Sequence, residues 1–118
     1  MYSRYIIQRS AISNYSVHNQ RGLVLDTAEN LTQIGQWTLN CFVKEQQRIA
    51  LYLALTRKNL TALASFPSSS SFLPEFKKFC VSFEKLEQEY LTGIVDRSVW
   101  ANGMLTWGTT LLRISEFI

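Results

Sequence analysis

The sequence predicts an all-α fold, arranged as a long antiparallel helical hairpin, and three observations lead to this prediction. Hydrophobic residues make up 47% of the 118 residues, with only 5 Gly and 2 Pro, which suits long helices better than a fold with many turns. Residues 28–64 and 75–117 each repeat apolar side chains at three- and four-residue steps. The serine-rich stretch between them, residues 65–74, is typical of a connector. If the arms kink or the chain oligomerises, the same pattern gives a helical bundle.

The chain divides into a short basic N-terminal segment, residues 1–25, and a hairpin domain, residues 26–118. The N-terminal segment contains three arginines and no acid. An irregular basic arm or a short packed element accounts for this composition, and an organellar transit peptide is the alternative. Asp26 and Glu29 have the spacing of a capping box, so the first arm is expected to begin there.

The first arm carries an apolar stripe from Leu31 to Leu63, interrupted by Glu45 and two threonines. In its middle, Ile49–Leu55 is apolar on every side of the helix. A helix without a polar face over two turns needs contacts on more than one side. This arm is therefore expected to contact more than its partner in the hairpin.

The second arm begins with Pro74 and Glu75, which suit the first turn of a helix. Proline needs no amide partner there, and a carboxylate interacts favourably with the helix dipole. Apolar residues from Phe76 to Tyr90 then follow the alternating spacing of a coiled-coil seam. Gly93 and two later glycines each weaken the helix by roughly 1 kcal/mol relative to alanine, so a kink or break is expected there.

Folding the arms about the centre of the connector places Phe76 opposite Leu63 and Phe83 opposite Thr56. The predicted helix–helix seam consists of Leu53, Leu60, Leu63, Phe76, Phe79, Phe83, Leu86 and Tyr90. Other large apolar residues cannot all lie in one seam. These are predicted to contact a surface or a partner: Leu51, Leu55, Leu91, Val95, Trp100 and Trp107.

No pattern for catalysis or for a cofactor is present in the sequence. The phosphate-binding, nucleophile-elbow and dinucleotide-binding glycine motifs are absent. His18 is the only histidine and is expected in a solvated loop. Cys41 and Cys80 lack the spacing of a zinc site and are expected to be free thiols of a cytoplasmic protein. The sequence therefore predicts a protein that is not an enzyme and that holds no metal or cofactor.

The sequence also limits the class of partner. No run of 18 apolar residues exists, so no transmembrane span is predicted. Arg57-Lys58 and Lys77-Lys78 flank the connector and could bind phosphate, but a net charge of +3 is too modest to predict a nucleic-acid partner. The 15 aromatic residues instead favour contact with another protein or an apolar phase.

The layout of residues 31–117 resembles that of the phasins, which coat polyhydroxyalkanoate granules. Leu31-Thr-Gln-Ile34 opens a long helix, Asn59-Leu-Thr-Ala-Leu-Ala64 closes it, and Phe76–Tyr90 follows the serine-rich spacer. The resemblance implies a helical coat protein and transfers no individual functional residue. We therefore expect a non-catalytic amphipathic protein that forms homo-oligomers and binds an apolar surface, such as a polyester storage granule. The alternative is a helical protein–protein interaction module, such as an adaptor, a secretion chaperone or an immunity protein.

Overall fold

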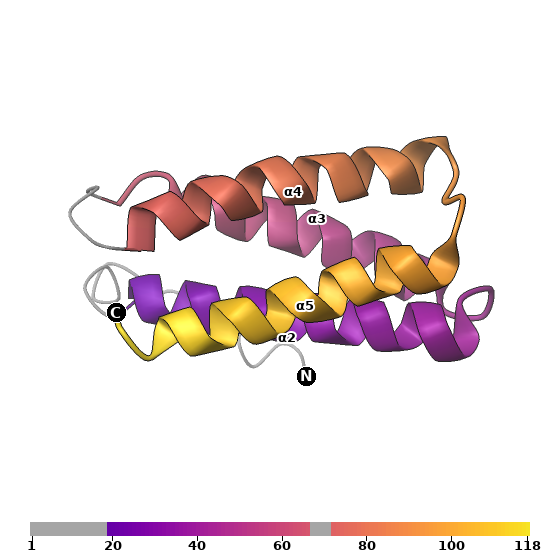
Figure 1. Ribbon diagram of the computed structural model, residues 1–118, viewed down its shortest axis with the longest axis horizontal. Coiled ribbons are helices and arrows are strands. Elements are labelled where there is room, and N and C mark those ends of the chain that lie inside the picture. Colours follow the sequence, from indigo (N-terminus) through magenta and orange to yellow (C-terminus); the bar gives the residue numbers. More distant parts are fainter. Residues whose placement is uncertain (1–18, 67–71) are drawn as a thin grey trace.

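The computed structural model describes residues 19–66 and 72–118, and within these ranges it contains four α-helices and no strand, which confirms the all-α prediction. The helices, labelled as in Figure 1, are α2 (Asn19–Cys41), α3 (Gln46–Leu63), α4 (Phe72–Thr92) and α5 (Arg97–Ser115). In this view α3 and α4 form one layer and α2 and α5 the other, and consecutive helices run in opposite directions. The molecule measures 40 × 35 × 22 Å, so it is a helical bundle rather than a hairpin of two straight arms.

The first predicted arm is divided into α2 and α3 by a turn at residues 42–45. No glycine or proline lies in this turn, and the helices on either side of it pack against each other. Trp37 packs edge-on against Tyr52 across the turn, with ring centroids 4.9 Å apart. Within the apolar segment Ile49–Leu55, Ile49 and Leu53 are buried in the bundle, whereas Leu51 and Leu55 stay exposed.

The start of α2 also differs from the prediction. The helix begins at Asn19 and runs through the predicted boundary at residue 25. Asp26 therefore lies inside the helix, and the predicted capping box at Asp26 and Glu29 is wrong. The short apolar run Leu23-Val-Leu25 accounts for the longer helix, because Val24 is fully buried in the bundle core and extends the apolar face of α2.

The second predicted arm breaks at residues 93–96, as its glycine content predicted. Gly93 has a φ of +116°, a backbone conformation that other residues rarely adopt. Asp96 then caps α5, because its carboxylate accepts a hydrogen bond of 3.1 Å from the backbone N–H of Val99. At the other end of α4, Glu75 lies in the first turn together with Pro74, as predicted.

Helices α2 and α5 form the most extensive contact between elements, and glycines permit their close approach. A Cβ atom on Gly35 would lie 2.6 Å from Leu105 Cγ, and one on Gly108 would lie 2.7 Å from Thr32 Oγ1. Each helix thus contributes one glycine that receives a side chain of the other. By contrast, the backbones of α4 and α5 lie further apart, and large side chains fill the space between them.

The core lies between the two layers and receives residues from all four helices. Leu31, Ile34, Ile49, Phe79, Phe83 and Met104 are each at most 1% exposed. Two threonines that interrupt the apolar stripe of the sequence are also buried there, and each hydroxyl donates to a carbonyl of its own helix. Thr38 bonds Ile34 O at 2.8 Å, and Thr56 bonds Tyr52 O at 2.8 Å. Because each hydroxyl is hydrogen-bonded within its own helix, both threonines can be buried in the apolar core.

Candidate functional site

The predicted seam residues lie at the interface of α3 and α4 with the rest of the bundle. Leu53, Leu60, Leu63, Phe76, Phe79 and Phe83 are buried, whereas Leu86 and Tyr90 are half-buried against the core. The two helices are also joined directly. Arg57 of α3 forms an ion pair with Glu87 of α4, and the Tyr90 hydroxyl donates to Gln46 O at 3.4 Å. The seam residues contact α2 and α5 as well as one another, because the bundle has four helices.

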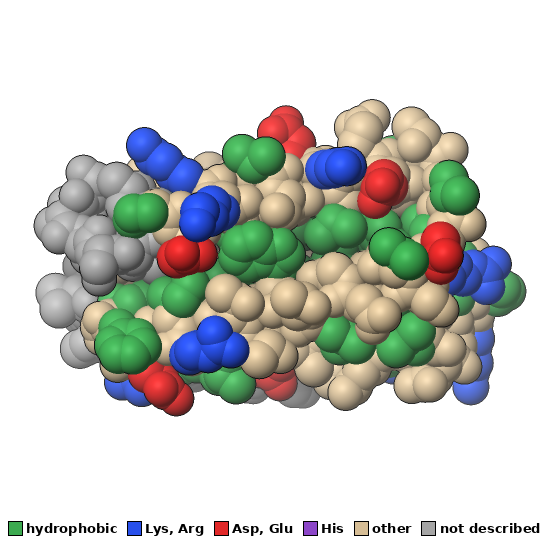
Figure 2. All heavy atoms as spheres, in the orientation of Figure 1, with side chains coloured by type: hydrophobic (Ala, Val, Ile, Leu, Met, Phe, Trp, Pro, Cys, Tyr) green, Lys and Arg blue, Asp and Glu red, His purple; other side chains and the backbone are tan. Residues whose placement is uncertain are grey.

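Two of the residues predicted to contact a partner are instead part of the core, which corrects that prediction. Trp100 is only 2% exposed, and its indole N–H donates to Leu86 O at 2.9 Å. Trp107 is half-buried, with its ring centroid 5.3 Å from that of Phe79. The uncharged sequence around these tryptophans indicated an apolar contact, and α4 of the same chain provides it. Figure 2 shows the resulting band of hydrophobic side chains between α4 and α5.

The other four predicted contact residues are exposed and lie in two separate places. On α3, Leu51 is 54% exposed and Leu55 is 39% exposed, and Ala50 and Ala54 beside them are also exposed. We call these four residues the α3 face. They lie opposite the buried side of the helix, and no described element covers them. The α3 face is therefore an apolar surface open to solvent.

The charges around the α3 face are positive. Helix α3 contains Arg48, Arg57 and Lys58 and no acidic residue. Arg57 is neutralised by Glu87 of α4, and Arg48 lies 3.4 Å from Glu45. Lys58 is exposed and enters no ion pair within the described residues. An uncovered apolar stripe on a basic helix is typical of a helix that lies on an apolar or lipid surface.

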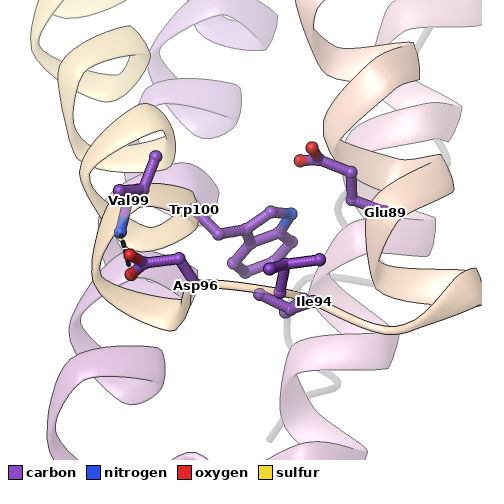
Figure 3. Close-up of a pocket in the computed structure, with 6 residues that line it drawn as sticks. Glu89, Ile94, Asp96, Val99 and Trp100 are labelled. Carbon is purple, nitrogen blue, oxygen red and sulfur yellow. Dashed lines mark hydrogen bonds between the residues drawn. The ribbon is translucent and has the colours of Figure 1, made fainter.

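The second exposed group lies where α4 turns into α5, and we call it the α4–α5 corner. Leu91 is 71% exposed, Val95 is 101% exposed and Val99 is 66% exposed. An open hollow of about 200 Å³ lies at this corner, lined by Glu89, Ile94, Val95, Asp96, Val99 and Trp100. In Figure 3 the Trp100 indole lies between Glu89 and Asp96, with Ile94 beside it. The hollow thus combines apolar walls with two carboxylates.

Neither carboxylate of the hollow is neutralised by a described basic residue. The nearest arginine in the sequence is Arg97, which follows Asp96. Its guanidinium lies 4.3 Å from the ring centroid of Phe42, a residue of the turn between α2 and α3. This cation–π contact holds Arg97 against the turn between α2 and α3. The Asp96 carboxylate accepts the capping hydrogen bond from Val99, and Glu89 extends from α4 toward α5 (Figure 3).

The two cysteines are free thiols, and both are half-buried. Burial raises the pKa of the Cys80 thiol; the positive charge of Arg57 opposes this effect and the negative charge of Glu84 adds to it. The thiolate is the nucleophilic form of cysteine, so a raised pKa makes Cys80 less reactive at neutral pH. The environment of Cys80 is that of a structural thiol.

The remaining groups with possible chemistry do not form a site within the described residues. His18 lies outside them. Among residues 19–66 and 72–118, no three His, Cys, Asp or Glu side chains are grouped as metal ligands, and no helix is long and apolar enough to cross a membrane. Of the four basic residues that flank the connector, Arg57 is paired with Glu87, and Lys78 lies 3.7 Å from Glu75. Ion pairing thus reduces the positive charge available there for phosphate.

The sequence reasoning missed most of the α4–α5 corner. Val99, Glu89 and Asp96 are not among the predicted contact residues, although one signal is present in the sequence. Asp96 lies three residues after Gly93 and precedes a new apolar repeat, which is the pattern of an N-cap. An N-cap at Asp96 predicts that a helix begins directly after it. Val95 then lies in the turn before this helix, Val99 lies in its first turn, and Glu89 lies near the end of the preceding helix.

The fold and these two surfaces define the class of the molecule, a small helical bundle with two separate exposed apolar surfaces. No protein-family model, no curated protein and no solved structure matches the chain.

Proposed function

We propose that this protein is a non-catalytic helical protein that binds apolar surfaces through the α3 face. The observation that carries the proposal is the exposure of Leu51 and Leu55 on a helix that contains no acidic residue and whose Lys58 enters no ion pair within the described residues. The tryptophans are not part of the proposed contact, because they are packed in the bundle. The polar outer positions of α3, such as Lys58, would remain at the edge of the contact.

The size of the α3 face indicates that one copy alone binds weakly. Complete burial of a fully exposed leucine is worth about 1.5–3 kcal/mol, so two leucines that are 54% and 39% exposed contribute together about as much as one. This free energy corresponds to weak binding by a single copy. Association of several copies on one surface would strengthen the attachment without any new contact to the surface. Self-association is therefore part of the proposed function.

The first surface to test is a polyester storage granule, because the layout of the chain resembles that of the phasins. A polyhydroxyalkanoate surface presents alkyl groups and ester carbonyls, and the α3 face offers apolar side chains with a few polar neighbours. Such granules lie in the cytoplasm, which is where the proposal puts the protein.

A granule-pelleting experiment tests the proposal. The full chain is mixed with purified poly(3-hydroxybutyrate) granules, which are then collected by centrifugation, and the bound fraction is measured over a range of protein concentrations. The double variant Leu51→Gln, Leu55→Gln is expected to bind at least about tenfold more weakly, because apolar contacts worth about 1.5–3 kcal/mol in total are lost. Oil droplets in place of granules test whether the surface must be a polyester.

Val81→Gln is the matched control. Val81 is 71% exposed on α4 and is not part of the α3 face. Its substitution removes a comparable exposed apolar group and is expected to leave granule binding unchanged. Wild-type protein that pellets no more than an unrelated globular protein would refute the proposal, as would an equal loss of binding in the Val81 variant.

A further inference from the structure

The outer side of α5 carries a row of exposed residues that the α3 face does not include. Val99, Asn102, Thr106, Thr109 and Arg113 are all exposed, and they follow one another at steps of three and four residues. This spacing places them along one side of the helix, as in a coiled-coil seam. We call these five residues the α5 face. In Figure 1 α5 lies in the other layer of the bundle from α3, so the two faces belong to different layers.

The distribution of charge distinguishes the α5 face from the α3 face. Between Arg97 and Arg113 the sequence contains no charged residue, and in Figure 2 the surface over the middle of α5 is free of blue and red side chains. Depletion of charge is typical of the centre of a protein interface. On α3, by contrast, Arg48 precedes Leu51 by three residues and Lys58 follows Leu55 by three. Two copies that met through the α3 face would bring these cations together, whereas the middle of the α5 face contains no charge to repel itself.

We propose that the α5 face binds the α5 face of a second copy of this chain, with the two helices antiparallel. In an antiparallel pair, residues that face each other have numbers with a constant sum. One such register places Val99 opposite Thr109 and Asn102 opposite Thr106 of the second copy. Each pair then occurs twice, as in a contact between identical surfaces related by a two-fold axis. The spacing of the row is therefore complementary to itself.

The charged residues at the ends of α5 favour the antiparallel orientation. In the same register Arg113 lies beside Asp96 of the second copy. The Asp96 Oδ1 atom accepts the capping hydrogen bond from the Val99 amide at 3.1 Å, which leaves Oδ2 for a guanidinium. Neither Asp96 nor Arg113 enters an ion pair within residues 19–66 and 72–118. A parallel pair would instead place Arg113 against its own copy, so charge complementarity selects the antiparallel dimer.

The inference rests on the self-association that is part of the proposed function, and it assigns that association to a particular surface. The contact leaves the α3 face of each copy uncovered, because the two faces share no residue. It also requires no granule, so it can be measured in solution.

Sedimentation equilibrium of the full chain and of charge variants tests the inference. The double variant Asn102→Glu, Thr106→Glu places glutamates opposite one another in the proposed dimer. It is expected to raise the dissociation constant of the dimer at least about tenfold, because like charges that face each other in an interface repel. The variant Asn102→Lys, Thr106→Lys is expected to have the same effect. An equimolar mixture of the two variants is expected to restore the dimer, since each glutamate then faces a lysine.

A third variant tests the orientation. In the chain with Asn102→Lys and Thr106→Glu, each lysine faces a glutamate in an antiparallel pair, so the dimer is expected to be retained. In a parallel pair each charge would face its like, and the dimer would be lost.

The matched control is Gln36→Glu, Asn40→Glu on α2. These two positions are exposed, uncharged and four residues apart, and they lie outside the α5 face. The control is expected to dimerise like the wild type. Far-UV circular dichroism is expected to show that every variant stays helical, because all the substituted positions are exposed.

Three results would overturn the inference: a wild-type chain that is monomeric at every concentration, a dimer that survives both like-charge variants, or a mixture of these variants that stays monomeric. The double variant Leu51→Gln, Leu55→Gln is expected to dimerise normally, and loss of its dimer would place the contact on the α3 face instead. A chain that dimerises through the α5 face but does not pellet with granules would refute the proposed function and support this inference. Granule binding by a chain that stays monomeric would refute the inference alone.

Discussion

At the scale of single residues, Trp100 shows how burial and hydrogen bonding combine in this bundle. Its indole is almost fully buried, contacts the Tyr90 ring at a centroid distance of 5.9 Å, and donates to Leu86 O. The uncharged stretch of sequence around Trp100 predicts an apolar contact. The sequence does not distinguish a partner molecule from a helix of the same chain, because both remove the same side chain from water.

Replacement of Trp100 by phenylalanine is expected to destabilise the fold by about 2 kcal/mol, since it removes a buried hydrogen-bond donor and part of a buried ring. Trp107→Phe is the matched comparison. Trp107 is half-buried and its ring contacts Phe79, but its indole N–H has no hydrogen-bond partner among the described residues. Its replacement is expected to cost less than about 1 kcal/mol. Urea unfolding of both variants measures the difference, and equal costs would contradict the assigned role of the Trp100 hydrogen bond.

The thiol of Cys80 leads to a prediction about pH. Because burial raises its pKa, the thiolate of the folded protein forms at higher pH than the thiolate of the unfolded chain. The rate of alkylation by iodoacetamide, measured on a Cys41→Ser background, is therefore expected to rise at higher pH in the native protein than in urea. A native profile at the same or lower pH would show that Arg57 outweighs the burial of the thiol.

At the scale of elements, the two helix breaks differ in how visible they are in the sequence. Gly93 marks the break between α4 and α5, because its positive φ is open to glycine and unfavourable for other residues. The turn at residues 42–45 has no such marker. Trp37 and Tyr52 pack across it, and a contact between residues on two helices is not visible in a local pattern. Local propensity thus predicts the first break but not the second.

The two glycines of α5, Gly103 and Gly108, differ in the space around them, so their replacement by alanine is expected to have opposite effects on stability. A Cβ on Gly108 would lie 2.7 Å from Thr32 Oγ1 and 3.1 Å from Ala28 O, so Gly108→Ala forces α2 and α5 apart and is expected to cost about 1–2 kcal/mol. A Cβ on Gly103 would approach only the Leu86 side chain, at 3.4 Å. Gly103→Ala is therefore expected to be neutral or to stabilise the helix by up to about 1 kcal/mol.

Thermal or urea unfolding of the two glycine variants, compared with wild type, measures these effects. The comparison keeps the chemical change constant and varies only the space around the new methyl group. If Gly108→Ala were as stable as Gly103→Ala, the close approach of α2 and α5 would not be a feature of the folded protein.

At the scale of the whole molecule, the α3 face and the α4–α5 corner leave apolar side chains in water. Monomeric proteins rarely leave large contiguous apolar surfaces uncovered, so these surfaces favour association. Sedimentation velocity of the wild-type chain is expected to show species larger than a monomer at increasing concentration. A wild-type chain that sediments as a monomer at every concentration would contradict self-association.

The sequence predicted the helical class and the apolar side of each arm, because these follow from local periodicity, whereas α4 begins at Phe72, inside the predicted connector of residues 65–74. The buried positions of Leu53, Leu60, Phe79 and Phe83 agree with that periodicity. The pairing of α2 with α5 was not predicted, since it depends on small residues at two positions far apart in the chain. The hollow was also missed, because it combines one side chain from the end of α4 with several from the turn and from α5.

The close contact of α2 with α5 also has a consequence for folding during synthesis. α2 is synthesised before the other described helices, but the helix that covers much of its apolar side, including the surroundings of Gly35, is made only after α3 and α4. Until α5 emerges, Leu31 and Ile34 lack their final neighbours, so the nascent chain exposes apolar surface to chaperones and to other chains. A chain stopped before residue 97 is therefore expected to stay partly folded, and completion of the bundle has to wait for α5.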